Sequence, residues 1–264
     1  MPSEPDHVPD LPSLVSALRT AGCVFAEKEA GLIGAAASDP AEVAALVERR
    51  VAGEPLEHVL GWAEFHGLRL AVMPGVFVPR RRTEFLVDQA AALTRPGAVV
   101  LDLCCGSGAV GAALLAVVPG IELHAADLDE AAVRCARRNL PDAQVHQGDL
   151  YRPLPPGLRG RIDVLVVIAP YVPTDAIGLM PPEARDHEPP TALDGGPDGL
   201  DVLRRILADA PTWLAPDGVL LTELGEDQLA TALAEAARCG LAARTVTAPD
   251  GSATLVVAGP TLGR

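Results

Sequence analysis

The sequence is poor in aromatic residues, in lysine and in paired cysteines, and each shortage narrows the classes of protein that it can encode. Aromatic residues make up 3% of the 264 residues, so alanine, leucine and valine must build the core. The hydrophobic fraction of 49% still suffices for a large core and excludes a disordered chain. Five cysteines without Cys-x-x-Cys spacing and six scattered histidines predict no metal site, no disulfide framework and a reduced, cytoplasmic protein.

Long apolar runs and a positive charge balance are also missing. No run of about 18 apolar residues suggests a membrane span, and the acidic start MPSEPDHVPD lacks the apolar segment of a signal peptide. The formal net charge of −14 argues against a nucleic-acid partner, because binding to phosphates needs a basic face. The three adjacent arginines at 80–82 could still form a local basic patch.

Changes in hydrophobic periodicity divide the chain into four parts. Residues 1–10 are predicted to be a flexible tail, and residues 11–56 show helical spacing with a helix-start signal at Pro40, which predicts a small helical domain. Residues 57–80 alternate apolar and polar side chains between glycines, which predicts a linking β-hairpin. Residues 81–264 form the largest part.

Strands and helices alternate through this last part. Apolar strands are predicted from Ala98, Ile121, Gln144, Ile162 and Gly218, with helices between most of them and a strand pair at the end. A long loop is expected over residues 173–199. This rhythm predicts an α/β fold of the Rossmann-like type, with a parallel sheet and helices on both faces.

A glycine-rich loop follows the first of these strands. Gly106-Ser107-Gly108-Ala109-Val110-Gly111 is a G-x-G-x-x-G sequence between a strand and a helix. Asp127 ends the next strand about 20 residues later, where its carboxylate can bind ribose hydroxyls. The pattern fits both a dinucleotide and S-adenosylmethionine, whereas a P-loop is excluded because no lysine follows the glycines.

Asp102 and Asp149 separate the remaining interpretations. Asp102 lies four residues before Gly106, where a carboxylate suits a cationic cofactor with an amino-acid tail and would repel a pyrophosphate. S-adenosylmethionine is therefore favoured over NAD. Asp149 follows the third strand and, with Leu150, should border the adenine. A loop that merely packs a helix on a strand is disfavoured, because Asp127 and Asp149 both stand at strand ends, where such sheets bind ligands.

Five stretches, in order along nearly the whole chain from about residue 11, resemble the release-factor glutamine methyltransferases of the HemK/PrmC type. They are GEPLEHVLGWAEFHGLRL (53–70), PGVFVPRRRTE (74–84), LDLCCGSGAV (101–110), GDLYRPL (148–154) and EARDHEPPTALDGGPDGLDVLRRIL (183–207). The resemblance implies an N-terminal helical domain that recognises the substrate, a hairpin and a class I methyltransferase domain. It further implies S-adenosylmethionine as cofactor and a glutamine amide nitrogen of a peptide-chain release factor as acceptor.

The resemblance also assigns roles to residues at matching positions. The acceptor motif would be Ile168, Ala169, Pro170 and Tyr171, and the substrate side would include Arg80, Thr83, Glu84 and His187. The cofactor site would consist of Asp102, Cys104, Cys105, Gly106, Ser107, Gly108, Asp127, Leu128, Asp149 and Leu150. Arg80 could equally form a surface salt bridge, and His187 in Asp186-His187-Glu188 could instead be structural. Gly195 and Gly196 are expected to supply positive φ angles in a turn.

The acceptor motif departs from the family signature, which is Asn-Pro-Pro-Tyr. In the family, the Asn oxygen and a backbone carbonyl accept the two amide hydrogens and aim a poorly nucleophilic nitrogen at the methyl group. Ile168 offers no such acceptor, and losing one preorganised contact typically costs about 10²–10³ in rate. Three outcomes stay open: slow methylation of a release factor, another protein or a small-molecule acceptor, or a catalytically impaired protein that only binds S-adenosylmethionine.

Overall fold

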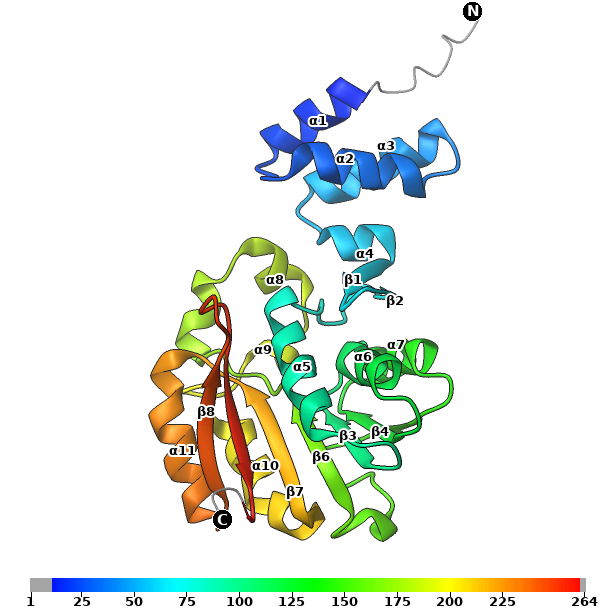
Figure 1. Cartoon of the computed structure of the whole chain (residues 1–264). Coiled ribbons are helices and arrows are strands. Elements are labelled where there is room, and N and C mark those ends of the chain that lie inside the picture. The colour runs from blue at the N-terminus through cyan, green and yellow to red at the C-terminus, as the bar shows by residue number, and fades with distance from the viewer. Residues whose placement is uncertain (1–10, 262–264) are drawn as a thin grey trace, which may run out of the picture.

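The N-terminal part of the chain is a small helical bundle (Figure 1). The computed structural model describes residues 11–261, so the tail predicted over residues 1–10 lies outside the described residues. The bundle contains α1 (Leu11–Thr20), α2 (Ala26–Ala36), α3 (Pro40–Val51) and α4 (Leu56–Leu60). Leu18 and Ile33 are fully buried at its centre. The predicted start of α3 is confirmed: the Asp39 side chain accepts a hydrogen bond from Glu42 N, and Pro40 begins the helix.

The linking hairpin is shorter than the predicted range 57–80. Its antiparallel strands are β1 (Trp62–Phe65) and β2 (Leu68–Ala71), and the residues from Val72 to Arg80 form no strand. The helix α4 occupies the start of the range and ends at Gly61, which has a left-handed φ of 77°. The predicted start of the hairpin at residue 57 is therefore wrong, because one short turn of helix gives too few residues to reveal its period.

A seven-stranded sheet forms the centre of the second part. Its strands are β3 (Val99–Leu103), β4 (Glu122–Asp127), β5 (Gln144–Gln147), β6 (Ile162–Val167), β7 (Leu214–Glu223), β8 (Ala242–Thr247) and β9 (Thr254–Gly259), in the order β5-β4-β3-β6-β7-β9-β8. The strands from β5 to β7 are parallel, as predicted. The last strand, β9, runs antiparallel to β7 and β8. A wholly parallel sheet is therefore wrong at this edge, where a short hairpin joins β8 to β9.

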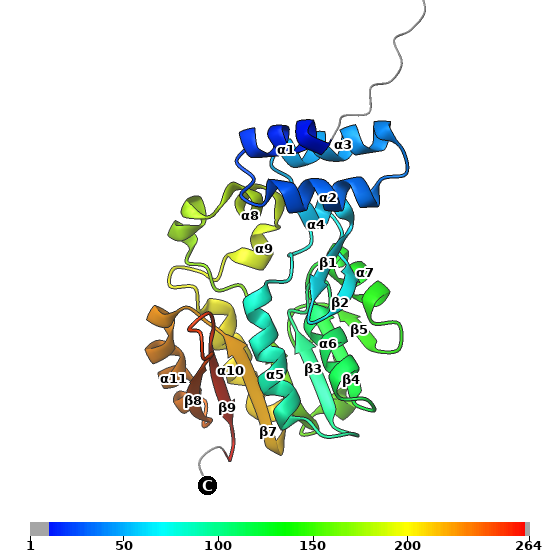
Figure 2. The same cartoon turned by 45° about the horizontal axis from the view of Figure 1, so that its top comes forward.

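Helices cover both faces of the sheet (Figures 1 and 2). The main ones are α5 (Glu84–Leu93), α6 (Ala109–Val117), α7 (Glu130–Asn139), α10 (Asp201–Trp213) and α11 (Leu229–Arg238), with 3-10 turns η1 (Arg81–Thr83), η2 (Pro156–Leu158) and η4 (Glu226–Gln228). One apolar core joins α5, α6 and α7 to the sheet, and a second joins α10 and α11 to its other face. Among the helices of residues 11–261, none is long and apolar enough to cross a membrane.

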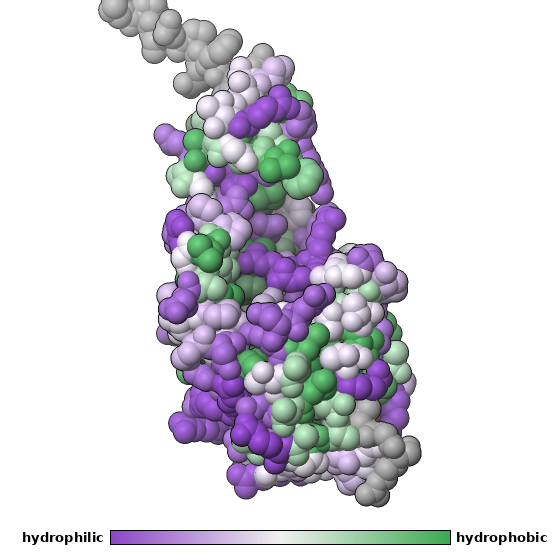
Figure 3. Space-filling view, turned by 90° about the vertical axis from the view of Figure 1, so that its left-hand side faces the viewer, coloured by the Kyte–Doolittle hydropathy of each residue, from purple (hydrophilic) through white to green (hydrophobic). Residues whose placement is uncertain are grey.

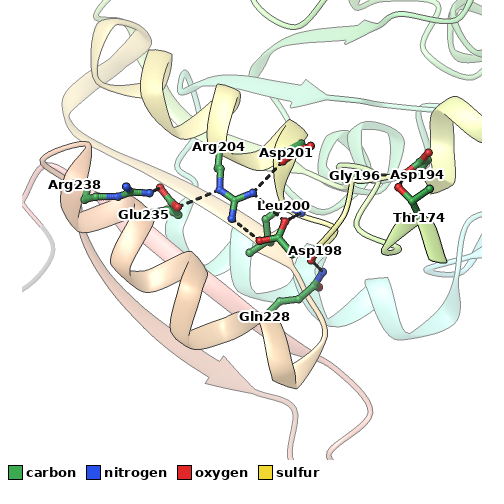
Figure 4. Close-up of polar contacts among 10 residues, drawn as sticks. All are labelled: Thr174, Asp194, Gly196, Asp198, Leu200, Asp201, Arg204, Gln228, Glu235 and Arg238. Atoms are coloured by element: carbon green, nitrogen blue, oxygen red, sulfur yellow. Dashed lines mark hydrogen bonds and ion pairs between the residues drawn. The ribbon is translucent and has the colours of Figure 1, made fainter. Parts of the chain in front are cut away.

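The loop expected over residues 173–199 contains three short helical segments. They are η3 (Thr174–Leu179), α8 (Pro182–His187) and α9 (Pro190–Leu193), and each follows or begins with a proline that fixes φ in the helical range. The Arg204 guanidinium, on α10, anchors the end of this loop through its ion pair with Asp198, and it also pairs with Asp201 of α10 and Glu235 of α11 (Figure 4). The end of the loop is therefore tied to the helix that follows it.

The turn at the end of this loop differs from the prediction at one glycine. Gly196 has a positive φ of 90°, as expected, and Gly199 has a φ of 75°, but Gly195 does not have a positive φ. Gly195 is instead required for close approach: a Cβ there would lie 2.6 Å from the carbonyl oxygen of Pro170. The turn is thereby pressed against the segment that follows β6.

A buried arginine joins the N-terminal bundle to the loop of the sheet domain. Arg50, at the end of α3, is 5% exposed and donates to Glu29 of α2 at 2.7 Å. Its second terminal nitrogen lies 2.7 Å from Glu183 of α8, which lies beside the bundle in Figure 2. Figure 3 shows a narrow upper lobe, the bundle, above a broader lower lobe, with hydrophilic side chains over much of the surface between them.

Replacing Arg50 by methionine should lower the free energy of unfolding by about 3–5 kcal/mol, because Glu29 would remain buried without its partner. Urea unfolding followed by circular dichroism measures this. The matched control is Arg19→Met, since the Arg19–Glu27 pair is more than 60% exposed on both sides. That variant should change stability by less than about 1 kcal/mol. Equal losses in the two variants would contradict the structural role of Arg50.

Candidate functional site

A single cavity of about 470 Å³ gathers most of the predicted site residues. It opens where β3, β4, β5 and β6 end, because the carboxyl ends of parallel strands meet at one edge of a sheet. Its lining includes Arg80, Thr83, Asp102, Cys104, Cys105, Gly106, Ser107, Asp127, Leu128, Asp149, Leu150, Ile168, Ala169, Pro170 and Tyr171. Their individual roles toward a cofactor or an acceptor stay predictions.

The loop between β3 and α6 owes its shape to three residues with left-handed backbone. Cys104, Gly106 and Gly108 have φ angles of 59°, 54° and 76°. At Gly106 a Cβ would meet only Phe77, at 3.9 Å, so this stretch of backbone is open to the cavity. Gly108 has a packing role instead, since a Cβ there would lie 2.8 Å from Leu140 Cδ1. A non-glycine residue at a left-handed position costs about 1–2 kcal/mol, which applies to Cys104.

Asp102 connects the strand before this loop to the helix after it. Its side chain is buried at 2% exposure, and its Oδ2 accepts a hydrogen bond of 2.9 Å from Gly111 N in α6. Burial raises the pKa of Asp102 to about 8, so the carboxyl is mostly protonated at neutral pH. In the structure Asp102 thus joins β3 to α6, and the role toward a cationic cofactor that the sequence predicts for it stays a prediction.

Asp127 lies at the end of β4 and touches the same loop. Its Oδ2 accepts from Gly106 N at 2.8 Å and its Oδ1 from Asp129 N at 2.9 Å. Burial raises the pKa of Asp127, and the backbone donors partly offset this. Each carboxylate oxygen keeps lone pairs that can accept from hydroxyl groups. The neighbouring Leu128 lines the cavity with its side chain 57% exposed, so it offers an apolar surface to a ligand.

Asp149 is already engaged by a basic partner. Both of its carboxylate oxygens accept from Arg205 Nη2, at 2.7 and 2.6 Å, and Arg152 lies 3.3 Å away. Arg205 also lines the cavity and was not predicted as a site residue. Leu150 follows with a φ of 51°, an unusual value for leucine that turns the chain at the cavity wall.

The acceptor motif at residues 168–171 follows β6 directly, and two later segments of the chain contact its backbone. Gln228 donates to the carbonyl oxygen of Tyr171 at 2.8 Å and to that of Asp198 at 3.0 Å. Gly195 packs against the carbonyl of Pro170. Ile168 is half-buried, packs on the core beneath α5 and lines the cavity. An apolar side chain therefore occupies the position where the family signature has an amide.

A buried glutamate organises the polar groups beside this motif. Glu223, at the end of β7, is 3% exposed and accepts from Thr83 Oγ1 at 2.9 Å and from Arg82 Nε at 2.5 Å. Arg82 Nη2 donates to the Tyr171 hydroxyl at 2.5 Å. Sequence analysis missed Arg82 and Glu223 as site residues. One feature of the sequence could have pointed to Glu223: it is an acid at the end of an apolar strand, as Asp127 is.

Arg80 and Glu188 form the second ion pair of this wall. Arg80 Nη2 donates to Glu188 Oε2 at 2.6 Å, its guanidinium lies over the Phe77 ring, and Glu188 also accepts from Val78 N. Arg80 therefore forms a salt bridge, the alternative considered for it, with its own side chain 29% exposed and a partner that is 1% exposed. Burial raises the pKa of Glu188, and Arg80 partly offsets this.

Two predicted substrate residues lie outside the cavity lining. Glu84 accepts a hydrogen bond from His66 N at 3.0 Å and so fixes the turn of the β1–β2 hairpin to α5. The His187 ring lies at the base of the N-terminal bundle, within 3.8 Å of where a Cβ on Gly53 would stand. Both residues have positions that suit domain packing.

The cavity fits the cofactor that the sequence predicts. The backbone at Gly106 is open to the cavity, the Asp127 carboxylate has lone pairs to spare, and Leu128 is exposed toward the same space. These groups match a ligand that combines a ribose with a flat ring, whose face the Leu128 side chain can contact. Within residues 11–261, no group of three or more His, Cys, Asp or Glu side chains could hold a metal ion.

The sheet order and the loop at its centre define a Rossmann-like methyltransferase. Residues 67–171 match the methyltransferase small domain. The fold is that of a methyltransferase from Pyrococcus furiosus, with a TM-score of 0.54, 18% identity and coverage of 73% of this chain and 88% of that one. Together with the sequence relatives described next, this makes the chain an S-adenosylmethionine-dependent methyltransferase.

Sequence relatives narrow this class. The chain is 43% identical over 189 residues to a release factor glutamine methyltransferase from Streptomyces coelicolor, covering 69% of this chain and 67% of the relative. It is also 41% identical over 196 residues to a 4-amino-L-phenylalanine/4-methylamino-L-phenylalanine methyltransferase from Streptomyces pristinaespiralis, covering 70% of this chain and 66% of that one. The chain belongs to the release factor glutamine methyltransferase family, as the sequence predicts.

Replacing Asp102 by asparagine should remove part of the pH dependence of stability. With a pKa of about 8 in the folded protein and 3.8 as the ordinary value, the carboxyl stabilises the fold fully below pH 4. That contribution is lost as the pH rises toward 8. Asparagine keeps an oxygen for Gly111 N but does not titrate. The difference in unfolding free energy, variant minus wild type, should therefore increase by about 1 kcal/mol for each pH unit between pH 5 and 7.

Urea unfolding at several pH values measures this difference, and other titrating groups cancel because both proteins share them. Parallel pH profiles would show that the Asp102 carboxyl is ionised in the folded protein, contrary to the expectation.

Proposed function

We propose that this chain transfers a methyl group from S-adenosylmethionine to a nitrogen atom held beside residues 168–171. The observation that carries the proposal is the position of Ile168, which lines the same cavity as the glycine-rich loop. A cofactor on the loop and an acceptor at the end of β6 would therefore meet in one enclosed space. Proximity and orientation of this kind are the main requirement for an in-line methyl transfer.

The residues around the glycine-rich loop would hold the cofactor. Backbone groups at Gly106 would approach it closely, Asp127 would accept from the ribose hydroxyls, and Leu128 with Leu150 would border the adenine. When bound, S-adenosylmethionine supplies a methyl group on a positively charged sulfur. The protein contributes the geometry, and the apolar side chain of Ile168 lies beside the acceptor position.

The geometry favours an amine over a carboxamide as acceptor. A carboxamide nitrogen is a poor nucleophile and needs acceptors for both of its hydrogens, but Ile168 has no polar atom. A buried N–H left unpaired costs about 1–3 kcal/mol, in addition to the lost orientation. The lone pair of a neutral amine is not delocalised into a carbonyl and needs no such activation. The relative from Streptomyces pristinaespiralis is named for an aromatic amine substrate, which supports this class of acceptor.

The second candidate is the glutamine of a peptide-chain release factor, methylated slowly. The names of several relatives, including the one from Streptomyces coelicolor, support it. The backbone carbonyls of residues 168–170 would then provide the remaining contacts to the amide. The N-terminal bundle would serve as the part that recognises a protein substrate. Nucleic acid is disfavoured by the net charge of −14.

Substituting Ile168 by asparagine should raise the rate of methyl transfer to a release-factor glutamine by about 10²–10³. The reason is that the new side chain supplies the missing acceptor for an amide hydrogen. Transfer of labelled methyl groups from S-adenosylmethionine to purified release factor measures the rate. The matched control is Ile168→Val, which stays apolar and should leave that rate low.

Two other results would change the conclusion. A wild-type rate on release factor close to that of Ile168→Asn would show that backbone acceptors suffice, and would favour the glutamine acceptor. Failure of wild type and variant to bind S-adenosylmethionine in a calorimetric titration would overturn the methyl-transfer proposal itself.

A further inference from the structure

The acceptor end of the cavity contains two arginine side chains that differ in how they are paired. Arg80 forms the largely buried ion pair with Glu188 and stacks on Phe77. Arg82 uses only part of its hydrogen-bond donors. Its Nε donates to Glu223 and its Nη2 to the Tyr171 hydroxyl, but a guanidinium has five N–H donors. Among residues 11–261, no partner is found for Arg82 Nη1.

Arg82 is also accessible to a ligand. Its side chain is 43% exposed, whereas Glu223 beneath it is 4% exposed, and Arg82 lines the cavity together with Ile168 and Tyr171. Glu223 and Tyr171 fix the guanidinium from one side, so its orientation is set before any ligand arrives. A preorganised guanidinium with free donors at one edge is a favourable partner for a carboxylate.

The charges of this wall are balanced. Arg80 is paired with Glu188 and Arg82 with Glu223, so a carboxylate would be received by the unused N–H donors of Arg82 and not by an excess of positive charge. The other acids of the cavity stand elsewhere. Asp102, Asp127, Asp129 and Asp149 lie at the cofactor end, and Glu57 and Glu183 lie toward the N-terminal bundle, where Glu183 is paired with Arg50.

No side chain of the motif at residues 168–171 is a ready base. Ile168, Ala169 and Pro170 cannot take up a proton, and burial raises the pKa of the Tyr171 hydroxyl. The nearby carboxylates of Glu188 and Glu223 are paired with Arg80 and Arg82. An alkyl ammonium would have to lose a proton before it could attack. An amine on an aromatic ring is neutral at physiological pH and needs no base. The apolar side chain of Ile168 provides a surface for such a ring.

We propose that Arg82 binds the carboxylate of a small aromatic amine acceptor whose ring lies against Ile168. The assignment rests on the proposed transfer to an amine and adds the substrate class and the residue that selects it. In the reaction, the amine lone pair forms the nitrogen–carbon bond and the carbon–sulfur bond breaks with its electrons left on sulfur. The surplus proton on nitrogen passes to water, and the carboxylate is unchanged.

The test compares two acceptors that differ only in the carboxylate. The full-length protein is given S-adenosylmethionine with 3-(4-aminophenyl)propanoate or with neutral 4-ethylaniline, and kcat/KM is measured for each. We expect the wild type to prefer the carboxylate probe by about 10- to 100-fold, the value of a hydrogen-bonded charge. Arg82→Met should bring this ratio close to one, and Arg82→Lys should restore part of it. The control Arg81→Met should leave the ratio unchanged.

The ratio of kcat/KM for the two probes does not depend on the fraction of folded protein, because unfolding lowers both rates by the same factor. Arg82→Lys adds a variant in which Glu223 keeps a positive partner. A wild type without preference, or an Arg82→Met variant with the full preference, would overturn the role of Arg82 while aromatic amine transfer stands. Transfer to neither probe, with S-adenosylmethionine bound, would overturn both the amine acceptor and the role of Arg82.

Discussion

The hydrogen bond from Gly111 N to the buried Asp102 carboxyl joins the end of the central strand to the start of α6, and the cofactor side of the cavity depends on it. The loop between these two points must turn through left-handed conformations at Cys104 and Gly106 to make the connection. That path brings Gly106 N to Asp127. The buried Asp102 carboxyl can therefore determine where Asp127, on the other side of the loop, presents its carboxyl oxygens.

The acceptor side is organised by separate contacts. Glu223 fixes Arg82 and Thr83, and Gln228 fixes the backbone at Tyr171. None of these contacts passes through the glycine-rich loop. A change such as that at residue 168 can therefore alter which nitrogen is accepted while the cofactor side stays intact, which is consistent with a family whose named members act on both a protein and an amino acid.

The sequence predicted those features that depend on neighbouring residues. Apolar runs, glycines and strand-end acids located the parallel strands and gathered Asp127 with the 168–171 motif. It missed features set by distant partners: Arg82 and Glu223 are 141 residues apart, and the antiparallel β9 depends on which edge its hairpin meets. The one-turn helix α4 and the short helices within residues 173–199 were missed because such segments are too short to show a period.

The Asn139 side chain adds a polar bridge between the hairpin and the glycine-rich loop, which also share an apolar core. Its amide accepts from Ala71 N and donates to the carbonyl oxygens of Ala71 and Ser107. One end of this bridge is the glycine-rich loop and the other is the hairpin that carries the N-terminal bundle. The position of the loop and the position of the hairpin therefore share one set of hydrogen bonds. Linkage makes any coupling through them reciprocal: whatever free energy loop binding contributes to the position of the hairpin, the position of the hairpin contributes to loop binding.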